Sequence, residues 1–175
     1  MEVRDYNGTD QWSANQIIER YARYVSKFSV AQPRSISPVV HEHGGIKWIY
    51  PVMDKVIDGI EDQDPACAQI GVEFIEEDQG FVFGAILKSN TARALRRFQH
   101  LTDEQIERIR RRAVYMYASG TVPREFGQYL RLLRYVGVGA YWEKVVSSVP
   151  KNNFAKRAQV YFATQFDDEG KSKPK

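Results

Sequence analysis

Arginine is the residue type in this sequence whose chemistry points most directly to a function. The segment from Arg93 to Arg134 contains ten arginines, no lysine and four acidic residues. The planar guanidinium group binds phosphate or carboxylate through two parallel hydrogen bonds and also stacks on aromatic rings. The candidate anion- or partner-binding residues are Arg96, Arg97, Arg108, Arg111, Arg112, Arg124, Arg131 and Arg134.

Two expected helices bring most of these arginines together. One side of a helix over 103–118 carries Arg108, Arg111 and Arg112. One face of a helix over 123–136 carries Arg124, Arg131 and Arg134. If the two helices form a hairpin, six arginines line one groove, with aromatic residues close in sequence: Tyr115, Tyr129, Tyr135, Tyr141 and Trp142. The alternative is that these arginines pair with the four local acidic residues and solvent, while the tyrosines belong to the core.

A second segment carries the opposite charge. Residues 54–78 contain nine acidic residues and one basic residue. We expect an acidic docking surface for a basic partner at Asp54, Asp58, Glu61, Asp62, Glu73, Glu76 and Glu77. The spacing does not match an EF-hand calcium loop, which needs alternating oxygen ligands and a central glycine. Two further interpretations stay open: a solvated helix face, or a head-to-tail contact with the arginines of another copy.

The net charge is unevenly distributed along the chain. Residues 1–92 carry 8 Lys+Arg and 14 Asp+Glu, and residues 93–175 carry 17 and 8, so the total of +3 hides halves of −6 and +9. A chain with this uneven charge distribution is suited to binding a charged partner.

Residues for catalysis or metal binding are few. His41 and His43 could supply two ligands, but a zinc site needs at least a third. Cys67 lies between two alanines and is expected in the core. The chain lacks the glycine-rich phosphate loops, the nucleophile elbow and the metal-binding motifs of known enzymes. We therefore expect no catalytic site, no metal and no cofactor; an enzyme with the histidine loop as its flap is the less favoured alternative.

Capping residues and apolar spacing predict the helices. Ser13 with Gln16, and Thr102 with Gln105, have the form of capping boxes, and Asp64 precedes a proline at a first helical position. The expected helices cover 14–28, 46–60 with a kink at Pro51, 65–78, 90–99, 103–118, 123–136, 140–149 and 154–166. The stretch 80–87 favours helix over an extended segment.

These elements predict an all-α fold of seven or eight short helices packed as antiparallel hairpins. The arrangement is expected to be a short HEAT-like stack or an irregular helical bundle. The expected organisation is a flexible lead-in over 1–12, one helical domain over 13–166 with a long loop over 30–45, and a disordered charged tail over 167–175.

The function that fits these features is a non-enzymatic protein–protein interaction or scaffold module, or a complex subunit. Its docking surfaces would be the acidic segment 54–78 and the arginine-rich segment 93–134. Nucleic-acid binding along the arginine and tyrosine groove is the alternative. No run is long and apolar enough for a membrane helix, no secretory signal is evident, and the single cysteine fits a reducing, cytoplasmic location.

Overall fold

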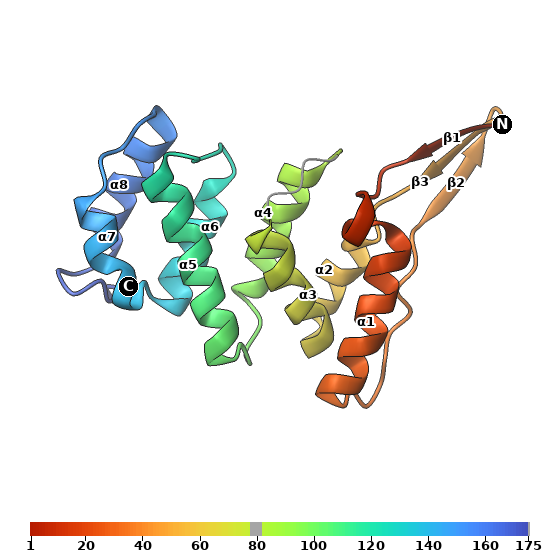
Figure 1. The fold of residues 1–175 in the computed structure, drawn as a ribbon, viewed down its shortest axis with the longest axis horizontal. Helices are drawn as coiled ribbons and strands as arrows, with labels where there is room; N and C mark the ends of the chain where they lie inside the picture. Colours follow the sequence, from red (N-terminus) through yellow and green to blue (C-terminus); the bar gives the residue numbers. More distant parts are fainter. Residues whose placement is uncertain (78–81, 175) are drawn as a thin grey trace. The chain divides into compact units, whose positions relative to one another are not determined.

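The computed structural model describes residues 1–77 and 82–174 and divides the chain into two compact units, Met1–His100 and Leu101–Lys175. Each unit has its own core, and Figure 1 labels their helices and strands. Among the described residues, no helix combines the length and apolar character needed to cross a bilayer. The helical domain expected over 13–166 spans parts of both units.

The described residues of the first unit form four α-helices, a 3-10 helix and a small sheet. Its elements in chain order are β1 (Glu2–Asp5), the 3-10 helix η1 (Asp10–Trp12), α1 (Ala14–Phe28), β2 (Val40–His43), β3 (Ile46–Ile49), α2 (Met53–Glu61), α3 (Pro65–Glu76) and α4 (Gly84–Leu95). Helix α3 packs against α1, α2 and α4, and its apolar residues supply much of the core. Trp12 contacts Phe74 edge-on, with ring centroids 4.9 Å apart, so η1 also closes onto α3.

The three-stranded sheet shows that the all-α prediction is wrong. Its strand order is β1-β3-β2, with β1 parallel and β2 antiparallel to β3. Glycines 44 and 45 have positive φ angles of 57° and 77°, which suit a two-residue hairpin turn. The chain is therefore mostly helical with a small mixed sheet.

The helix expected over 46–60 is wrong in its first third. The three-residue spacing of Ile46 and Ile49 fits a helix, but these residues belong to β3 and pair with β2. Their segment is β-branched and aromatic, which favours a strand once a hairpin turn precedes it. Helix α2 begins only at Met53, after Pro51. Of the stretch 80–87, residues 80 and 81 lie outside the described residues, and α4 begins at Gly84.

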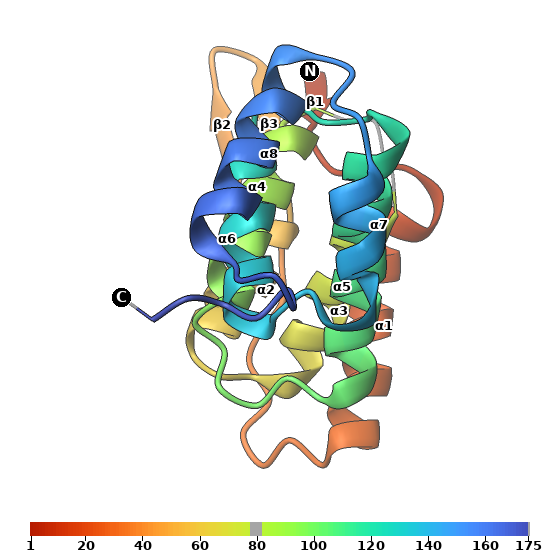
Figure 2. The ribbon, with the colours of Figure 1, turned by 90° about the vertical axis from the view of Figure 1, so that its left-hand side faces the viewer.

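The second unit is built from helices. Its elements are α5 (Asp103–Ser119), α6 (Phe126–Val136), the 3-10 helix η2 (Gly139–Tyr141), α7 (Trp142–Ser147) and α8 (Asn153–Gln165). Helix α5 packs against α6 and α7, and α6 packs against α8 (Figure 2). Residues 166 and 172 form an isolated antiparallel bridge, so part of the tail folds back after α8.

Candidate functional site

A cavity of the second unit lies between α6 and α8 and has a volume of about 700 Å³. One side of the cavity is lined by Pro123, Arg124, Phe126, Gly127 and Leu130. The other side is lined by Phe154, Arg157, Ala158 and Tyr161, which repeat at three- and four-residue spacing along one face of α8. We call this cavity the α6–α8 groove.

Local capping interactions fix where α8 begins beside the groove. The Asn152 side chain accepts a hydrogen bond from the Ala155 amide at 2.8 Å and donates one to the Gly120 carbonyl at 3.3 Å. Gly120 ends α5 in the left-handed conformation, with φ of 83°. The Lys151 ammonium also donates to the Ser119 carbonyl at 3.2 Å. The start of α8 is therefore tied to the end of α5.

Contacts between a half-buried arginine and the backbone fix the end of α6. The Arg110 side chain donates to the Gly137 carbonyl at 3.0 Å and to the Val136 carbonyl. The last carbonyls of a helix have no partner within the helix and carry partial negative charge, so a cation there is stabilising. Arg110 was not among the candidate site residues, and its role here is to terminate α6.

The floor of the groove is apolar. Phe126, Leu130 and Ala158 are buried, and Phe126 stacks on Tyr129 with centroids 5.7 Å apart. A Cβ atom built on Gly127 would have no heavy atom within 4 Å. The glycine thus leaves part of the groove open.

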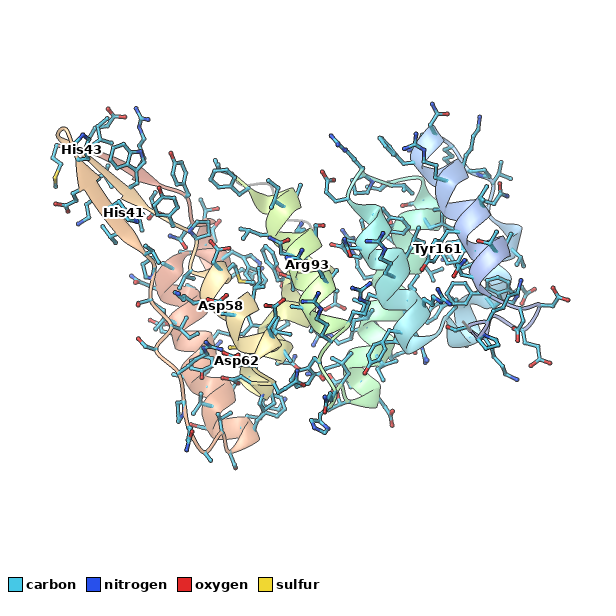
Figure 3. All side chains as sticks on the ribbon, turned by 180° about the vertical axis from the view of Figure 1, so that it is seen from behind. His41, His43, Asp58, Asp62, Arg93 and Tyr161 are labelled. Atoms are coloured by element: carbon cyan, nitrogen blue, oxygen red, sulfur yellow. The ribbon has the colours of Figure 1, made fainter. Side chains whose placement is uncertain are left out.

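Two guanidinium groups stand at the edge of this floor. Arg124 and Arg157 are exposed, and neither has a carboxylate partner in the part of the chain that the structure describes. The Arg157 guanidinium lies 6.0 Å from the Phe154 ring centroid. Tyr161, labelled in Figure 3, brings the aromatic face of α8 to the same groove. The groove can therefore receive a ligand that is apolar in its centre and anionic at its edge.

The structure divides the predicted arginines between the two units. Arg96 and Arg97 belong to the first unit, where Arg97 forms an ion pair with Glu61 at 3.1 Å. The other six belong to the second unit, and only Arg124 lines the α6–α8 groove. Arg131 is exposed and has no carboxylate partner among the described residues.

The remaining arginines of the predicted set have other surroundings. Arg111 is exposed on α5, whereas Arg108 and Arg112 are half-buried, and all three interact with other parts of the chain. Arg134 is half-buried and donates to the Lys173 carbonyl at 3.4 Å. Arg157 was missed by sequence reasoning, although its position one turn after Phe154 and one turn before Tyr161 was a usable signal.

Four of the predicted acidic residues form an exposed face on α2 and its C-cap: Asp54, Asp58, Glu61 and Asp62. Figure 3 labels Asp58 and Asp62. Asp62 forms an ion pair with Arg34 at 3.1 Å, in addition to the Glu61–Arg97 pair. Desolvation, together with the neighbouring Asp58 carboxylate, raises the pKa of Asp54.

The acidic residues of α3 are used inside the unit. Glu73 accepts hydrogen bonds from Arg20 at 3.2 Å, from Gln69 at 2.9 Å and from Tyr24. Glu77 accepts from the Trp12 indole at 2.8 Å. Glu76 is half-buried and also has an interaction within the chain. Glu73 and Glu77 therefore hold α1 and η1 against α3, whereas the α2 carboxylates face solvent. Asp78, at the end of the acidic segment, lies outside the described residues.

The histidine pair lies on the sheet, away from further metal ligands. His41 and His43, both labelled in Figure 3, are exposed on β2. The His41 ring lies perpendicular to the Tyr50 ring, with centroids 5.5 Å apart. Within residues 1–77 and 82–174, no group of three or more side chains has the composition and closeness of a metal site.

The prediction that Cys67 belongs to the core is confirmed. It is buried on α3, and burial raises the pKa of its thiol, which disfavours the reactive thiolate. Its sulfur lies 2.3 Å from the position that a Cβ on Gly59 would take, so Gly59 and Cys67 together allow the close approach of α2 and α3.

A smaller cavity of about 320 Å³ lies among α5, α7, α8 and the residues after α8. Its aromatic wall includes Trp142, Phe162 and Phe166, and the Trp142 indole donates to the Asp168 carbonyl at 2.8 Å. The Lys173 ammonium in its wall donates to the Ala163 carbonyl at 3.1 Å. Two of its charged groups, Asp167 and Lys173, already bond to the chain itself, unlike Arg124 and Arg157 in the α6–α8 groove.

The two units keep opposite net charges, although the contrast is smaller than between residues 1–92 and 93–175. The first unit contains 11 Lys+Arg and 14 Asp+Glu, a net charge of −3. The second contains 14 and 8, a net charge of +6. The α6–α8 groove thus belongs to the cationic unit, and the exposed carboxylates of α2 belong to the anionic one.

No protein-family model, curated protein or solved structure matches this chain.

Proposed function

We propose that this protein is a non-enzymatic protein–protein interaction module that binds an acidic partner through its C-terminal unit. The observation that carries the proposal is the exposure of Arg124, Arg131 and Arg157 without carboxylate partners among the described residues. A cationic surface whose charges are not neutralised from within attracts and orients an anionic partner. The exposed carboxylates of α2 would form a separate surface for a basic partner, or for the cationic unit of a second copy.

The positions of the ionisable groups support binding rather than catalysis. Catalytic sites concentrate groups with perturbed pKa values. The described groups with raised pKa values include Arg4, Tyr21, Asp54, Cys67, Tyr117 and Tyr141, and none of these six lines the α6–α8 groove. A cytoplasmic location is part of the proposal, because a single buried cysteine is suited to a reducing compartment.

Nucleic-acid binding is the second candidate, and exposed aromatic residues favour it. Tyr135 lies one helical turn after Arg131 on α6, with 51% of its surface exposed, and Tyr115 on α5 is 57% exposed. An exposed tyrosine beside an arginine can stack on an unpaired base while the guanidinium binds phosphate. The predicted groove residues Tyr129, Tyr141 and Trp142 are less accessible.

The test compares anionic probes on the full chain by fluorescence anisotropy. The probes are a labelled glutamate-rich peptide and labelled single- and double-stranded DNA, each titrated at about 50 and about 200 mM salt. We expect saturable peptide binding that Arg124→Glu with Arg131→Glu weakens. Arg23→Glu with Lys156→Glu changes the net charge equally at exposed positions and should leave most of the binding intact.

Other results of this titration would contradict the proposal. Tighter binding of DNA with a steep salt dependence would favour the nucleic-acid candidate. The absence of binding to any probe would contradict both. Light scattering on the same samples would show whether the protein instead forms oligomers through its own acidic and basic surfaces.

A further inference from the structure

We propose that the α6–α8 groove is the binding site for an acidic peptide segment that carries a large apolar side chain. The apolar side chain would enter the groove, and carboxylates on either side of it would bind Arg124 and Arg157. This inference rests on the proposed interaction function and specifies where the partner binds and what chemistry it presents.

The apolar floor requires an apolar anchor in the ligand. Phe126, Leu130 and Ala158 close the bottom of the groove, and Phe154 stays 39% exposed on its wall. Burying apolar surface against such a floor stabilises a complex by about 25 cal/mol for each Å² removed from water. A ligand that offered only charged groups would leave this surface in contact with water.

The rim requires negative charge around that anchor. Arg124 and Arg157 lie in the walls of one cavity, and neither is engaged by a carboxylate among the described residues. Each guanidinium can bind one carboxylate through two hydrogen bonds. Charge complementarity therefore selects aspartate- or glutamate-containing segments over basic or neutral ones.

The polar groups of the groove favour a peptide over a nucleotide. A nucleobase site needs donors and acceptors that meet the base edge. Besides the two guanidinium groups, Tyr161 carries the only polar side chain in the described lining. The volume of about 700 Å³ lies within the roughly 300–1,000 Å³ of ligand sites, which accommodates an apolar side chain and its neighbours.

Gly127 provides a way to close the groove without changing its charge. No heavy atom lies within 4 Å of a Cβ at this position, and its φ is not in the left-handed region. A leucine there can therefore extend into open space from a helix that tolerates leucine well. Gly127→Leu should fold normally while occupying the space that the anchor needs.

The experiment measures binding of two labelled peptides to the full chain by fluorescence anisotropy. In the first peptide a Trp–Leu pair is flanked by glutamates; in the second, two serines replace the pair. We expect the first peptide to bind at least about tenfold more tightly than the second. Arg124→Glu with Arg157→Glu, and Gly127→Leu separately, should each weaken its binding about tenfold or more.

The matched control reverses two exposed cations that do not line the groove. Arg23→Glu with Lys156→Glu carries the same change in net charge, and it should change the affinity for the first peptide less than about threefold. Circular dichroism of each variant confirms the helical fold before binding is compared.

Three results would overturn the inference. If both peptides bind the wild type equally and the groove variants behave like the control, the groove is not the site, although the interaction function stands. If neither peptide binds the wild type, the proposed function fails with it. If single-stranded DNA binds the wild type more tightly than the first peptide does, and the same groove variants weaken that DNA binding, the groove is a nucleic-acid site.

Discussion

Arg20 of α1 and Glu73 of α3 form an ion pair in which both side chains are largely withdrawn from solvent. The Arg20 Nη1 and Glu73 Oε2 atoms lie 3.2 Å apart, and the side chains are 9% and 13% exposed. The guanidinium also lies 4.4 Å above the Trp12 ring and donates to the Gln11 carbonyl. One arginine thus joins α1, η1 and α3.

Arg20→Ala should strongly destabilise the N-terminal unit. Removing one partner of a buried pair leaves the other charge without compensation, which costs about 3 kcal/mol or more. Urea unfolding of the full chain, followed by tryptophan fluorescence, measures the change. Arg23→Ala, at an exposed position of the same helix, is the control and should be close to neutral. Equal unfolding midpoints for the two variants would contradict the role of the pair.

The close approach of α2 and α3 makes Gly59 sensitive to substitution. A Cβ on Gly59 would lie 2.3 Å from the Cys67 Sγ atom and 2.9 Å from its Cβ. Gly59→Ala should therefore lower the free energy of unfolding by about 1–3 kcal/mol through overpacking.

The matched substitution Gly127→Ala should be neutral or stabilising by up to about 1 kcal/mol, because its Cβ meets open space and alanine favours helix. Thermal unfolding of both variants by circular dichroism compares them. If Gly59→Ala were as stable as Gly127→Ala, the close contact with Cys67 could not control the packing of the two helices.

The buried phenol of Tyr21 predicts a loss of stability in alkaline solution. Its hydroxyl donates to the Asp64 carboxylate at 2.7 Å and accepts from the Arg34 amide at 2.9 Å. Burial, followed by the hydrogen bond to Asp64, raises the pKa of Tyr21 to about 12. The folded state holds this proton more tightly than the unfolded chain, whose tyrosine pKa is about 10. Stability is therefore complete below about pH 10 and falls as the pH rises towards 12.

The variant Tyr21→Phe isolates this contribution. At neutral pH it should be less stable than the wild type by about 1 kcal/mol or more, because Asp64 and the Arg34 amide lose their partner. Between about pH 10 and 12 the wild type should lose up to about 1.4 kcal/mol of stability for each pH unit, whereas the variant has no such proton to lose. The difference in stability between the two proteins should therefore narrow over this range. Urea midpoints measured across this range would show a constant difference if the Tyr21 proton were not linked to folding.

The contact between Arg110 and the end of α6 predicts a selective effect in the C-terminal unit. Arg110→Ala removes the donor to the Gly137 and Val136 carbonyls and should cost about 1–3 kcal/mol. Arg131→Ala, an exposed residue of α6 without a carboxylate partner in the described chain, should change stability by less than about 0.5 kcal/mol. Hydrogen exchange of the α6 amides provides the measurement, and unchanged protection in Arg110→Ala would rule out the capping role.

Helix boundaries that depend on local chemistry could be predicted from the sequence. The Thr102–Gln105 capping box is confirmed, and Asp64 accepts hydrogen bonds from the Ala66 and Cys67 amides as an N-cap should. The box at Ser13 is wrong, because Ser13 makes no side-chain cap and Gln16 instead donates to Glu19. The start of the helix predicted over 90–99 is also wrong, since α4 begins earlier, at Gly84.

Features that depend on distant pairing could not be predicted. Strand β1 is polar and exposed, and it is recognisable only through its partner β3. The α6–α8 groove combines Arg124 with Arg157, which lie on segments separated by α6, η2 and α7. The high density of arginines over residues 108–112 led the sequence analysis to place candidate binding residues on α5. Net charge per segment indicated the cationic unit, but the packing of α8 on α6 decides which guanidinium groups meet an apolar floor.

The parallel pairing of β1 with β3 has a consequence for the order of folding. Glu2 lies opposite Ile46, and the intervening chain includes all of α1. During synthesis β1 cannot pair until that whole stretch and β3 have left the ribosome, and the entropy of closing so long a loop further delays the contact. The Trp12 indole forms its hydrogen bond later still, because its acceptor, Glu77, lies further along the chain. The tertiary contacts of β1 and of Trp12 therefore form only after most of this unit has been synthesised.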